Sequence, residues 1–334
     1  MKAIYLIKNG VPEKAFEFRD IVPTKPENDE VGIAVEASGI NFADITARLG
    51  DYRDCPPLPT IIGYEVVGRI DKVGTDVKDF KIGDRVLAFT RFGGYSQYVT
   101  QKAIAVSKID EDMNTGEALA LATQYSTAFY ATNVATNVLP NENVLIHAGA
   151  GGVGTALIQL CKLKQAKIYS TAGSETKLEY LREQGVDVPI NYNKTDFSTI
   201  IKEPIDVAFD SLGGDNFRKS YKLLQKGGRI VGYGASSFTD ARNIIDKGIM
   251  AAKFGIYHPA ELLMESRSII GVNMLRIADF KPQTLKYCMD SVIMLLKEEK
   301  IKPQVGKLYK ASEVNVAHTD MENRKTTGKI GIIW

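Results

Sequence analysis

The sequence predicts an α/β protein of two domains, one built on a doubly wound parallel sheet and one rich in short β-strands. From about residue 144, apolar runs alternate with helical patterns, as they do in βαβ units. Residues 1 to about 125 instead hold short apolar runs separated by glycine-containing turns, which is typical of a barrel-like β domain. A length of 334 residues suits two domains with ample cores.

The fold is organised around residues 144–162, where an apolar run enters a glycine cluster and a helical pattern leaves it. Gly149, Gly151 and Gly154 fit the G-x-G-x-x-G pattern of a dinucleotide-binding turn. The helix expected to start near Val153 would direct its positive end at a pyrophosphate. The alternative is a tight strand-to-helix turn that binds no ligand.

In the first domain, strand patterns are followed by a helical pattern. The expected strands are residues 1–7, 31–37, 66–70 and 85–89, with a turn at residues 81–84. From about Glu117 the pattern becomes helical through Tyr130. No apolar run in the sequence approaches the length needed to span a bilayer.

The rest of the chain reads as strands and helices in alternation. The expected strands are residues 166–172, 205–210, 229–233 and 268–272; the expected helices are 174–184, with Ser174 as its N-cap, 215–225 and 283–299. The last of these helices places Leu285, Val292, Leu295 and Leu296 on one face. Residues 306–334 are expected to return to short strands and to rejoin the first domain.

Bulk composition excludes several classes of function. Lys and Arg number 42 against 40 Asp and Glu, a net charge of +2, which gives no reason to expect a nucleic-acid partner. The N-terminus lacks the apolar stretch of a secretory signal. Three well-separated cysteines make neither a disulfide framework nor a metal cluster, which favours a reducing cytosol, and we therefore expect a cytoplasmic protein.

Residues 244–264 are more apolar than a connecting loop should be. Three interpretations compete for this segment. It packs in the core or in a dimer contact, or it forms a lid over a hydrophobic substrate, or it is a peripheral membrane foot. Too few lysines lie nearby for a convincing anionic-membrane surface.

With these residues in view, the chain resembles the medium-chain dehydrogenase/reductase superfamily, and within it the zinc-free quinone oxidoreductases (the zeta-crystallin group), especially the vesicle amine transport protein 1-like branch. The resemblance covers nearly the whole chain. It is carried by residues 39–44, 48–52, 56–59, 63–68, 83–86, 148–154, 210–214 and 306–307 onward.

The resemblance implies a GroES-like domain, residues 1–125 with 300–334, and a Rossmann NADP-binding domain, residues 126–270. Residues 271–299 would be a connecting strand and the long helix. It also implies an active site in the cleft between the two domains, and a homodimer.

Zinc is not expected. Zinc-dependent relatives place a cysteine where Asn41 stands and a histidine where Tyr64 stands, and tetrahedral zinc needs such ligands. The closely spaced four-cysteine lobe of a structural zinc site is also missing from the sequence. His147 lies just before the glycine turn, where we expect a buried, hydrogen-bonded strand-end residue rather than a catalyst.

NADPH is expected rather than NADH. An NAD site has an acid about twenty residues after the glycines, and here the strand runs out through residues 170–177 with no acid at its tip, although Glu175 is close. The family pattern binds the 2′-phosphate at Gly173, Lys177 and Tyr192, and Ser174 adds a hydroxyl at a helix N-terminus. Lys177 has an alternative role as a solvated helix lysine.

The resemblance and the chemistry of phenols and amides point to Asn41, Tyr52 and Tyr64 as catalytic residues. Hydride transfer to an enone or quinone leaves negative charge on the acceptor oxygen, and such donors stabilise that charge in a dry site. Alternatively, Tyr52 is a packed aromatic residue. Asn41 and Asp44 are alternatively loop-stabilising residues, and for Asp44 this is the favoured interpretation.

The family pattern adds further cofactor contacts. They are Asn41, Thr127, Gly151, Gly152, Val153, Gly154, Ser211, Gly234, Asn273 and, in a basic stretch near the C-terminus, Arg324 and Lys329. Thr127 is alternatively a helix residue only, and the basic residues are alternatively uncommitted surface charges.

The leading hypothesis is therefore a metal-independent, NADPH-dependent reductase that transfers hydride to a quinone or an α,β-unsaturated carbonyl. The alternative is an NADPH-binding protein that associates with lipid or membrane and has weak or no catalysis.

Overall fold

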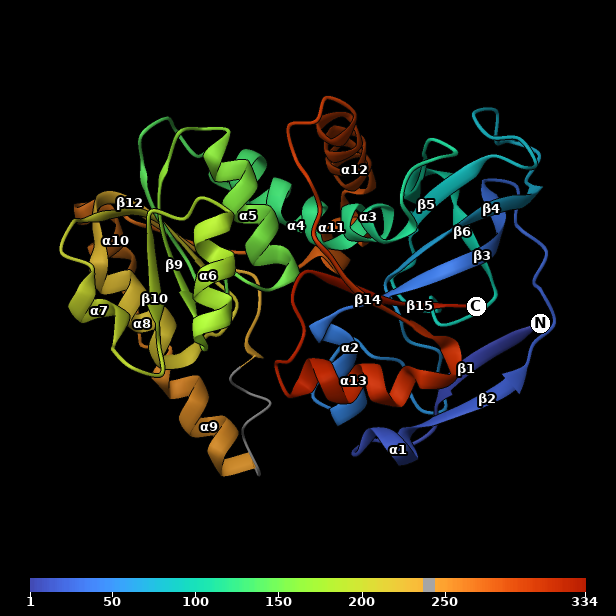
Figure 1. Cartoon of the computed structure of the whole chain (residues 1–334), viewed down its shortest axis with the longest axis horizontal. Helices are drawn as coiled ribbons and strands as arrows, with labels where there is room; N and C mark the ends of the chain where they lie inside the picture. Colours follow the sequence, from blue (N-terminus) through green and yellow to red (C-terminus); the bar gives the residue numbers. More distant parts are fainter. Residues whose placement is uncertain (237–243) are drawn as a thin grey trace. The chain divides into compact units, whose positions relative to one another are not determined.

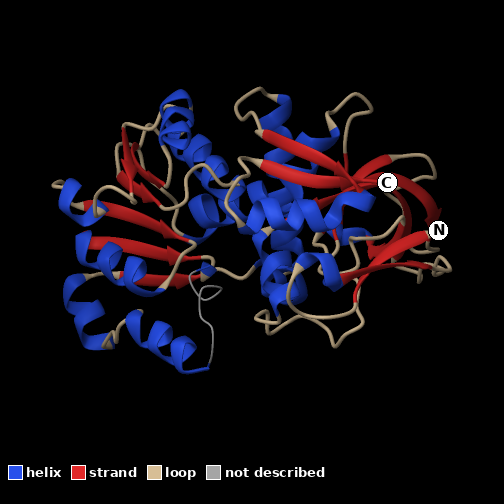
Figure 2. Ribbon diagram, turned by 60° about the horizontal axis from the view of Figure 1, so that its bottom comes forward, coloured by secondary structure: helices blue, strands red, loops and turns tan. Residues whose placement is uncertain are grey.

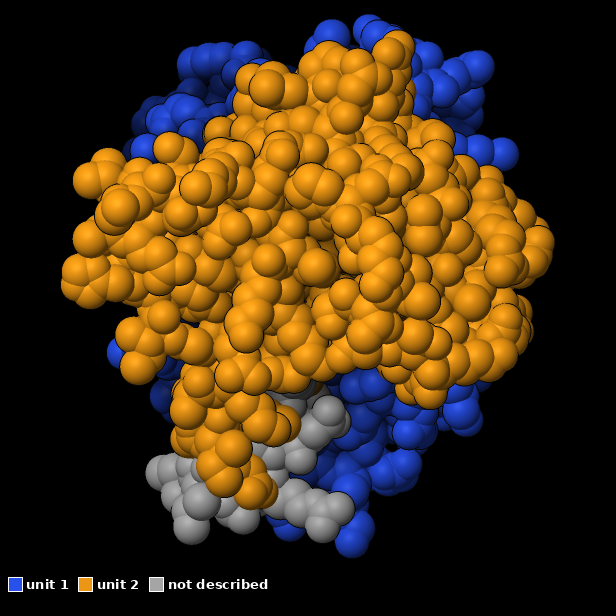
Figure 3. Space-filling view, turned by 90° about the vertical axis from the view of Figure 1, so that its left-hand side faces the viewer, with its two compact units in different colours: residues 1–126, 274–334 blue, residues 127–273 orange. Residues whose placement is uncertain are grey.

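The computed structural model describes residues 1–236 and 244–334 and divides into two compact units. Unit 1 comprises residues 1–126 and 274–334, and unit 2 comprises residues 127–273 (Figure 3). Within the described residues, no helix combines the length and the apolar character that crossing a membrane requires.

Unit 2 is a doubly wound α/β domain, as predicted. Its six strands are all parallel and run in the order β10-β9-β8-β11-β12-β13. They are β8 (Asn143–Ile146), β9 (Lys167–Ala172), β10 (Val188–Asn191), β11 (Ile205–Asp210), β12 (Leu224–Gly232) and β13 (Ser268–Gly271). Helices lie on both faces of this sheet (Figure 2). They are α5 (Gly152–Lys162), α6 (Glu175–Glu183), α7 (Phe197–Ile200), α8 (Gly214–Leu223), α9 (Ile244–Lys253) and α10 (Pro259–Glu265).

The centre of unit 2 is the predicted strand-turn-helix. Val144, Leu145 and Ile146 of β8 are fully buried because β9 and β11 flank the strand and helices cover both faces. The chain then turns through Ala148, whose φ of 52° lies in the left-handed region. A Cβ on Gly154 would collide with the Ala148 carbonyl oxygen, so the glycine is required for this close approach of helix and turn.

Unit 1 is built on two sheets, shown at the right of Figure 1. A hairpin pairs β1 (Lys2–Leu6) with β2 (Phe16–Asp20), and a seven-stranded sheet carries the rest. The larger sheet comprises β14 (Val305–Lys310), β15 (Lys329–Ile333), β3 (Glu30–Ile40), β4 (Glu65–Val73), β5 (Arg85–Phe89) and β7 (Val106–Lys108) in that order, with β6 (Tyr98–Lys102) on β3. Its helices are α1 (Pro12–Ala15), α2 (Phe42–Leu49), α3 (Thr115–Ala120), α4 (Ser126–Phe129, at the unit boundary), α11 (Met274–Phe280), α12 (Pro282–Lys297) and α13 (Val314–Glu322).

Three details differ from the predicted elements. The helix expected over residues 117–130 contains two π-helical segments, Leu121–Tyr125 and Tyr130–Ala135. Residues 306–334 contain α13 as well as short strands. On α12, Leu285 and Val292 are buried as expected, but Leu295 and Leu296 are only half-buried, because the buried face turns toward Cys288, Met289 and Ile293 instead.

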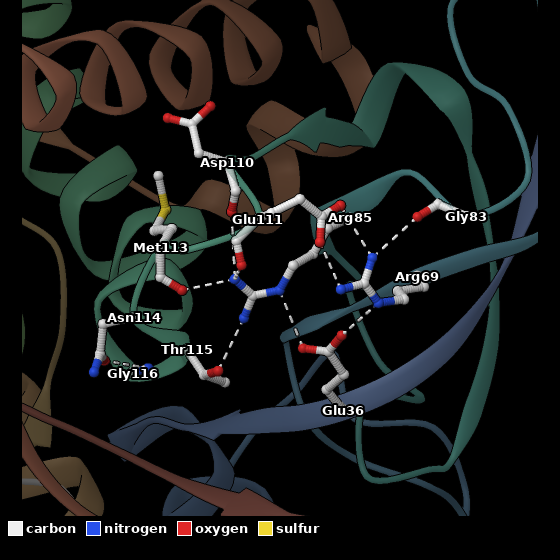
Figure 4. A network of polar contacts seen from close by, with 10 residues as sticks. All are labelled: Glu36, Arg69, Gly83, Arg85, Asp110, Glu111, Met113, Asn114, Thr115 and Gly116. Atoms are coloured by element: carbon white, nitrogen blue, oxygen red, sulfur yellow. Dashed lines mark hydrogen bonds and ion pairs between the residues drawn. The ribbon is translucent and has the colours of Figure 1, made fainter.

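A buried arginine anchors the chain that leads into α3. Arg85 is 6% exposed, and its guanidinium donates to the carbonyl oxygens of Glu111 (3.0 Å) and Met113 (2.6 Å) and to Thr115 Oγ1 (3.0 Å) (Figure 4). Its Nε pairs with Glu36 at 3.2 Å. This single side chain therefore fixes β5 to the segment that precedes the π-helical turns.

Candidate functional site

The predicted cofactor residues of unit 2 follow the carboxyl ends of its six parallel strands. The glycine turn follows β8, Gly173 to Lys177 follow β9, and Tyr192 follows β10. Ser211, Gly234 and Asn273 come after β11, β12 and β13. Strands of a parallel sheet present these ends along one edge, where open α/β sheets bind their ligands. Thr127, on α4, is the exception and is 8% exposed.

The glycine turn has the shape that a diphosphate requires. At Gly151 an added Cβ would lie only 3.2 Å from the Ala148 carbonyl oxygen, a tight contact, so a side chain there would press on the backbone of the turn. Gly152 and Val153 begin α5, and the first N–H groups of a helix have no intrahelical acceptor. These amides and the helix dipole attract an anionic group, so the residues present fit the pyrophosphate of a dinucleotide.

The loop after β9 is also shaped by its neighbours. Ser174 caps α6, as predicted, with its Oγ accepting from the Lys177 backbone N–H at 3.3 Å. A Cβ on Gly173 would collide with the hydroxyl of Tyr192, so these two predicted phosphate-binding residues lie in contact. Charged and hydroxyl donors at a helix N-terminus provide charge-assisted hydrogen bonds for a phosphate.

His147 is a buried, hydrogen-bonded strand-end residue, as predicted. It is 1% exposed, and its ring nitrogens lie 3.1 Å from Thr171 Oγ1 and 2.8 Å from Ser220 Oγ. Burial lowers the pKa of this imidazole, although the nearby Asp210 carboxylate opposes the effect. The same Nε2 faces both Ser220 and Asp210, so these three side chains do not form the relay of a hydrolase triad.

In unit 1, Asn41 belongs to a buried charged cluster that we define as Asn41, Glu65, Thr123 and Lys329. The Asn41 Nδ2 donates to both Glu65 carboxylate oxygens, at 2.9 and 2.8 Å. Its Oδ1 accepts from Lys329 Nζ at 3.2 Å. Lys329 also pairs with Glu65, and Thr123 Oγ1 donates to the same carboxylate. Both partners of the ion pair are 0% exposed, so the Lys329 charge is engaged inside this cluster and does not face solvent.

Asp44 fixes the backbone that carries this cluster. Its carboxylate accepts from the N–H of Asn41 at 2.7 Å and from the N–H of Gly63 at 3.0 Å, and it is completely buried. Burial raises the pKa of Asp44 well above its ordinary value, against the lowering effect of the Asn41 hydrogen bond. Asp44 therefore joins the start of α2 to the segment before β4, in agreement with the structural role expected for it.

Tyr52 and Tyr64 form an aromatic cluster with Phe92. The ring centroids of Tyr52 and Tyr64 lie 6.0 Å apart, and that of Phe92 lies 5.3 Å from Tyr64. Burial, followed by the charge of Asp54, raises the pKa of Tyr52 to about 12, and burial also raises the pKa of Tyr64. The Tyr64 hydroxyl is buried and makes no hydrogen bond of normal geometry within the described residues, although the Tyr52 hydroxyl is close enough to influence its pKa. A neutral phenol with an uncommitted O–H is a donor available to a ligand oxygen.

The donor set at Asn41 and Tyr64 does not fit zinc. A zinc site uses thiolate, imidazole and carboxylate ligands, whereas Asn41 directs N–H groups at Glu65 and Tyr64 keeps its proton. Within residues 1–236 and 244–334, no cluster of three or more His, Cys, Asp or Glu side chains is arranged to hold a metal ion.

Sequence reasoning missed Glu65, which accepts from Asn41, and Thr123, which donates to Glu65. An acid at the start of the apolar run Glu65-Val66-Val67 was the available signal, because a buried carboxylate needs a cation and hydrogen-bond donors. No local pattern indicates Thr123 or Lys329 as those partners, since they lie far away in the sequence.

Two family models match the chain. The "Alcohol dehydrogenase GroES-like domain" matches residues 27–113, and the "Zinc-binding dehydrogenase" model matches residues 152–289. Each model falls mainly in one of the two compact units.

Several known proteins are similar over almost the whole chain. The rat (Rattus norvegicus) synaptic vesicle membrane protein VAT-1 homolog is 32% identical over 331 residues, which cover 97% of this chain and 81% of that protein. Escherichia coli quinone oxidoreductase, solved in complex with NADPH, has a TM-score of 0.87 at 27% identity and covers 100% of both chains. CurK enoyl reductase has a TM-score of 0.85 at 26% identity, covering 99% of this chain and 98% of its own.

This similarity confirms the fold expected from the sequence, with its GroES-like part, its Rossmann part and the glycine turn. The chain belongs to the medium-chain dehydrogenase/reductase family, in which it is similar to the VAT-1 homologues and the quinone oxidoreductases.

Proposed function

We propose that this protein is a metal-independent reductase that uses NADPH to reduce a quinone or an α,β-unsaturated carbonyl. The observation that carries the proposal is the pair of neutral phenols, Tyr52 and Tyr64, in which the buried Tyr64 hydroxyl makes no hydrogen bond of normal geometry within the described residues. A reduced carbonyl or quinone oxygen becomes negative, and uncommitted phenol donors stabilise that charge. The glycine turn and the loop after β9 supply the binding residues for NADPH.

Different residues of the chain bind the phosphates of the cofactor and the oxygen of the acceptor. The N–H groups of Gly152, Val153 and Gly154 bind the diphosphate, while Ser174 and Lys177 bind the 2′-phosphate. When bound, NADPH supplies the hydride. Tyr52 and Tyr64 orient the acceptor oxygen and donate hydrogen bonds to it as charge develops. Solvent or a phenol then supplies the proton that completes the reduction.

Asn41 acts differently from the two phenols. Both functional ends of its amide are bonded within the charged cluster, so we propose that it positions the start of α2 and its neighbours while Tyr52 and Tyr64 contact the substrate. An Asn41→Ala variant should therefore lose stability along with activity, whereas phenylalanine variants of the tyrosines should lose activity alone.

The test is NADPH oxidation, followed by absorbance at 340 nm, with a panel of quinones and enones. Turnover of at least about 1 s⁻¹ is expected with one class of acceptor, which is within the usual range for enzymes. The double variant Tyr52→Phe/Tyr64→Phe should lose about 10²-fold in kcat, the usual effect of removing an oxyanion donor. Tyr5→Phe is the matched control, since it removes a hydroxyl from β1 of the same unit. No turnover with any acceptor would reject the proposal.

A second copy of the chain is the proposed partner. β13 ends the parallel sheet with a neighbour on one side only, and the side chains of Ile256, Leu263 and Met264 just before it are 100%, 81% and 82% exposed. Exposed apolar residues beside an unpaired strand edge are typical of a subunit interface.

Light scattering of the intact protein and of Leu263→Glu tests this partner. A dimer that becomes a monomer in the variant is expected. The competing hypothesis, a lipid-associated protein with weak catalysis, predicts co-sedimentation with phosphatidylcholine vesicles that the same substitution abolishes. We also expect the protein to work in the cytoplasm, where its three free cysteines stay reduced.

A further inference from the structure

An acid lies close to the place in unit 2 where NAD-binding chains keep one. Glu175 is the first residue of α6 and follows the carboxyl end of β9, about twenty residues after the glycine turn. A carboxylate there accepts from the ribose 2′-hydroxyl of NAD and repels the 2′-phosphate of NADP. Glu175 would therefore weaken the binding of NADP unless its charge is paired with another group of the protein.

The Glu175 carboxylate contacts the turn after β10. Its Oε1 lies 2.8 Å from Lys194 Nζ and accepts from Asn191 Nδ2, also at 2.8 Å. These contacts, that of Lys194 first, lower the pKa of Glu175, so the carboxylate is ionised and directed at the turn.

The turn that carries Lys194 is held against the loop after β9. The Asn191 carbonyl oxygen accepts from the N–H groups of Lys194 and Thr195, both at 3.1 Å. Asn193 Nδ2 donates to the Gly173 carbonyl oxygen at 2.7 Å, and the Tyr192 ring fills the space beside Gly173. The turn that carries the lysine is therefore fixed to the loop after β9, which forms part of the predicted phosphate site.

We propose that Lys194 is a specificity-determining residue, which, with Asn191, holds Glu175 away from the 2′-phosphate and so favours NADP over NAD. The inference rests on the proposed function, because it concerns the same cofactor. Its role is indirect: Lys194 acts through Glu175, while Ser174 and Lys177 remain the groups that contact the phosphate.

Isothermal titration of the intact protein with NADP⁺ and NAD⁺ tests this proposal without any substrate. In Lys194→Gln, the freed Glu175 carboxylate should raise the Kd for NADP⁺ about tenfold. The Kd for NAD⁺ should stay the same or fall, because the freed carboxylate can accept from the ribose 2′-hydroxyl. Adenosine 2′,5′-bisphosphate and adenosine 5′-phosphate should repeat this difference, because the effect is confined to the adenosine half.

A double variant separates an indirect role from a direct one. If Lys194 acts through Glu175, then Glu175→Gln/Lys194→Gln should bind NADP⁺ as tightly as Glu175→Gln alone. Equally weak binding by Lys194→Gln and the double variant would overturn the proposal, because Lys194 would then contact the phosphate itself. An unchanged Kd for NADP⁺ in Lys194→Gln would overturn it as well.

Lys167→Gln is the matched control. It removes one lysine from the same unit and breaks a comparable exposed ion pair, with Glu203 at 2.6 Å, but at the opposite end of β9. Its nucleotide affinities should equal those of the wild type. If the wild-type protein binds neither nucleotide, the proposed function is rejected. If it binds NADP⁺ but the Lys194 and Glu175 variants bind it with equal affinity, only the role of Lys194 is rejected.

Discussion

Two lysine–glutamate pairs in this protein have the same chemistry and opposite surroundings. The Lys329–Glu65 pair of unit 1 has both side chains 0% exposed, whereas the Lys194 and Glu175 side chains of unit 2 are 68% and 60% exposed. Burial makes an ion pair expensive to break, because the remaining charge loses both its partner and its water. An exposed pair contributes little to stability but still determines where a charge points. The comparison separates a pair that maintains the fold from one that selects a ligand.

The largest expected effect is at the buried pair. Lys329→Met leaves the buried Glu65 carboxyl group without its cation, so the free energy of unfolding should fall by about 3–5 kcal/mol. The only tryptophan, Trp334, reports on unit 1, since its Nε1 donates to Ser38 Oγ at 2.9 Å. Guanidinium unfolding followed by its fluorescence measures the loss.

Two variants sharpen that result. Lys2→Met breaks an exposed pair of the same unit and should change stability by no more than about 0.5 kcal/mol. Lys329→Met/Glu65→Gln removes both charges and keeps an acceptor for Asn41, so it should be more stable than Lys329→Met alone. Equal losses in the single and double variants would show that desolvated charge is not the cause.

A smaller loss is expected from the buried arginine of Figure 4. Arg85→Met removes the donors to the 111–115 segment and should lower the free energy of unfolding by about 2–3 kcal/mol, since charge-assisted hydrogen bonds are lost. Arg19→Met, which breaks the exposed pair with Glu17, is the control and should have little effect. The same tryptophan signal measures both, and a loss for Arg19→Met as large as that for Arg85→Met would contradict the role of burial.

The exposed pair should show almost no effect on stability. Lys194→Gln is expected to change the unfolding free energy by no more than about 0.5 kcal/mol, while its nucleotide preference changes. Circular dichroism during unfolding checks the first quantity, since it includes unit 2. A large destabilisation would place this pair in the same class as Lys329 and Glu65 and end the contrast between them.

The pH dependence of catalysis should show the smallest effect. Because the pKa of Tyr52 is raised to about 12, its phenol keeps its proton and its donor function well above pH 10, the ordinary tyrosine value. The profile of kcat/KM from pH 6 to 10.5 should therefore show no decrease caused by Tyr52, which means no falling limb that is present in the wild type and absent in Tyr52→Phe. Such a limb near pH 10 would show that burial does not raise this pKa.

The sequence predicts unit 2 better than unit 1 for a physical reason. In unit 2 the strand, glycine turn and helix are consecutive, so local pattern predicts β8 and α5 and, through parallel strands, the edge where Gly173 and Ser211 lie. In unit 1 the other members of the charged cluster around Asn41 come from β4, a π-helical turn and β15. No periodicity indicates that residues so far apart in the chain meet. The role of Lys194 was hidden in the same way, because only the folded turn brings it to Glu175.

The two π-helical segments have a consequence for protein engineering. Each accommodates a residue beyond the α-helical count, and one residue corresponds to about 100° of rotation around the axis. If residues 121–135 formed a regular α-helix of equal length instead, Thr123 would therefore rotate away from Glu65 and lose its hydrogen bond. Grafts and chimaeras made with related dehydrogenases should carry these widened turns over intact.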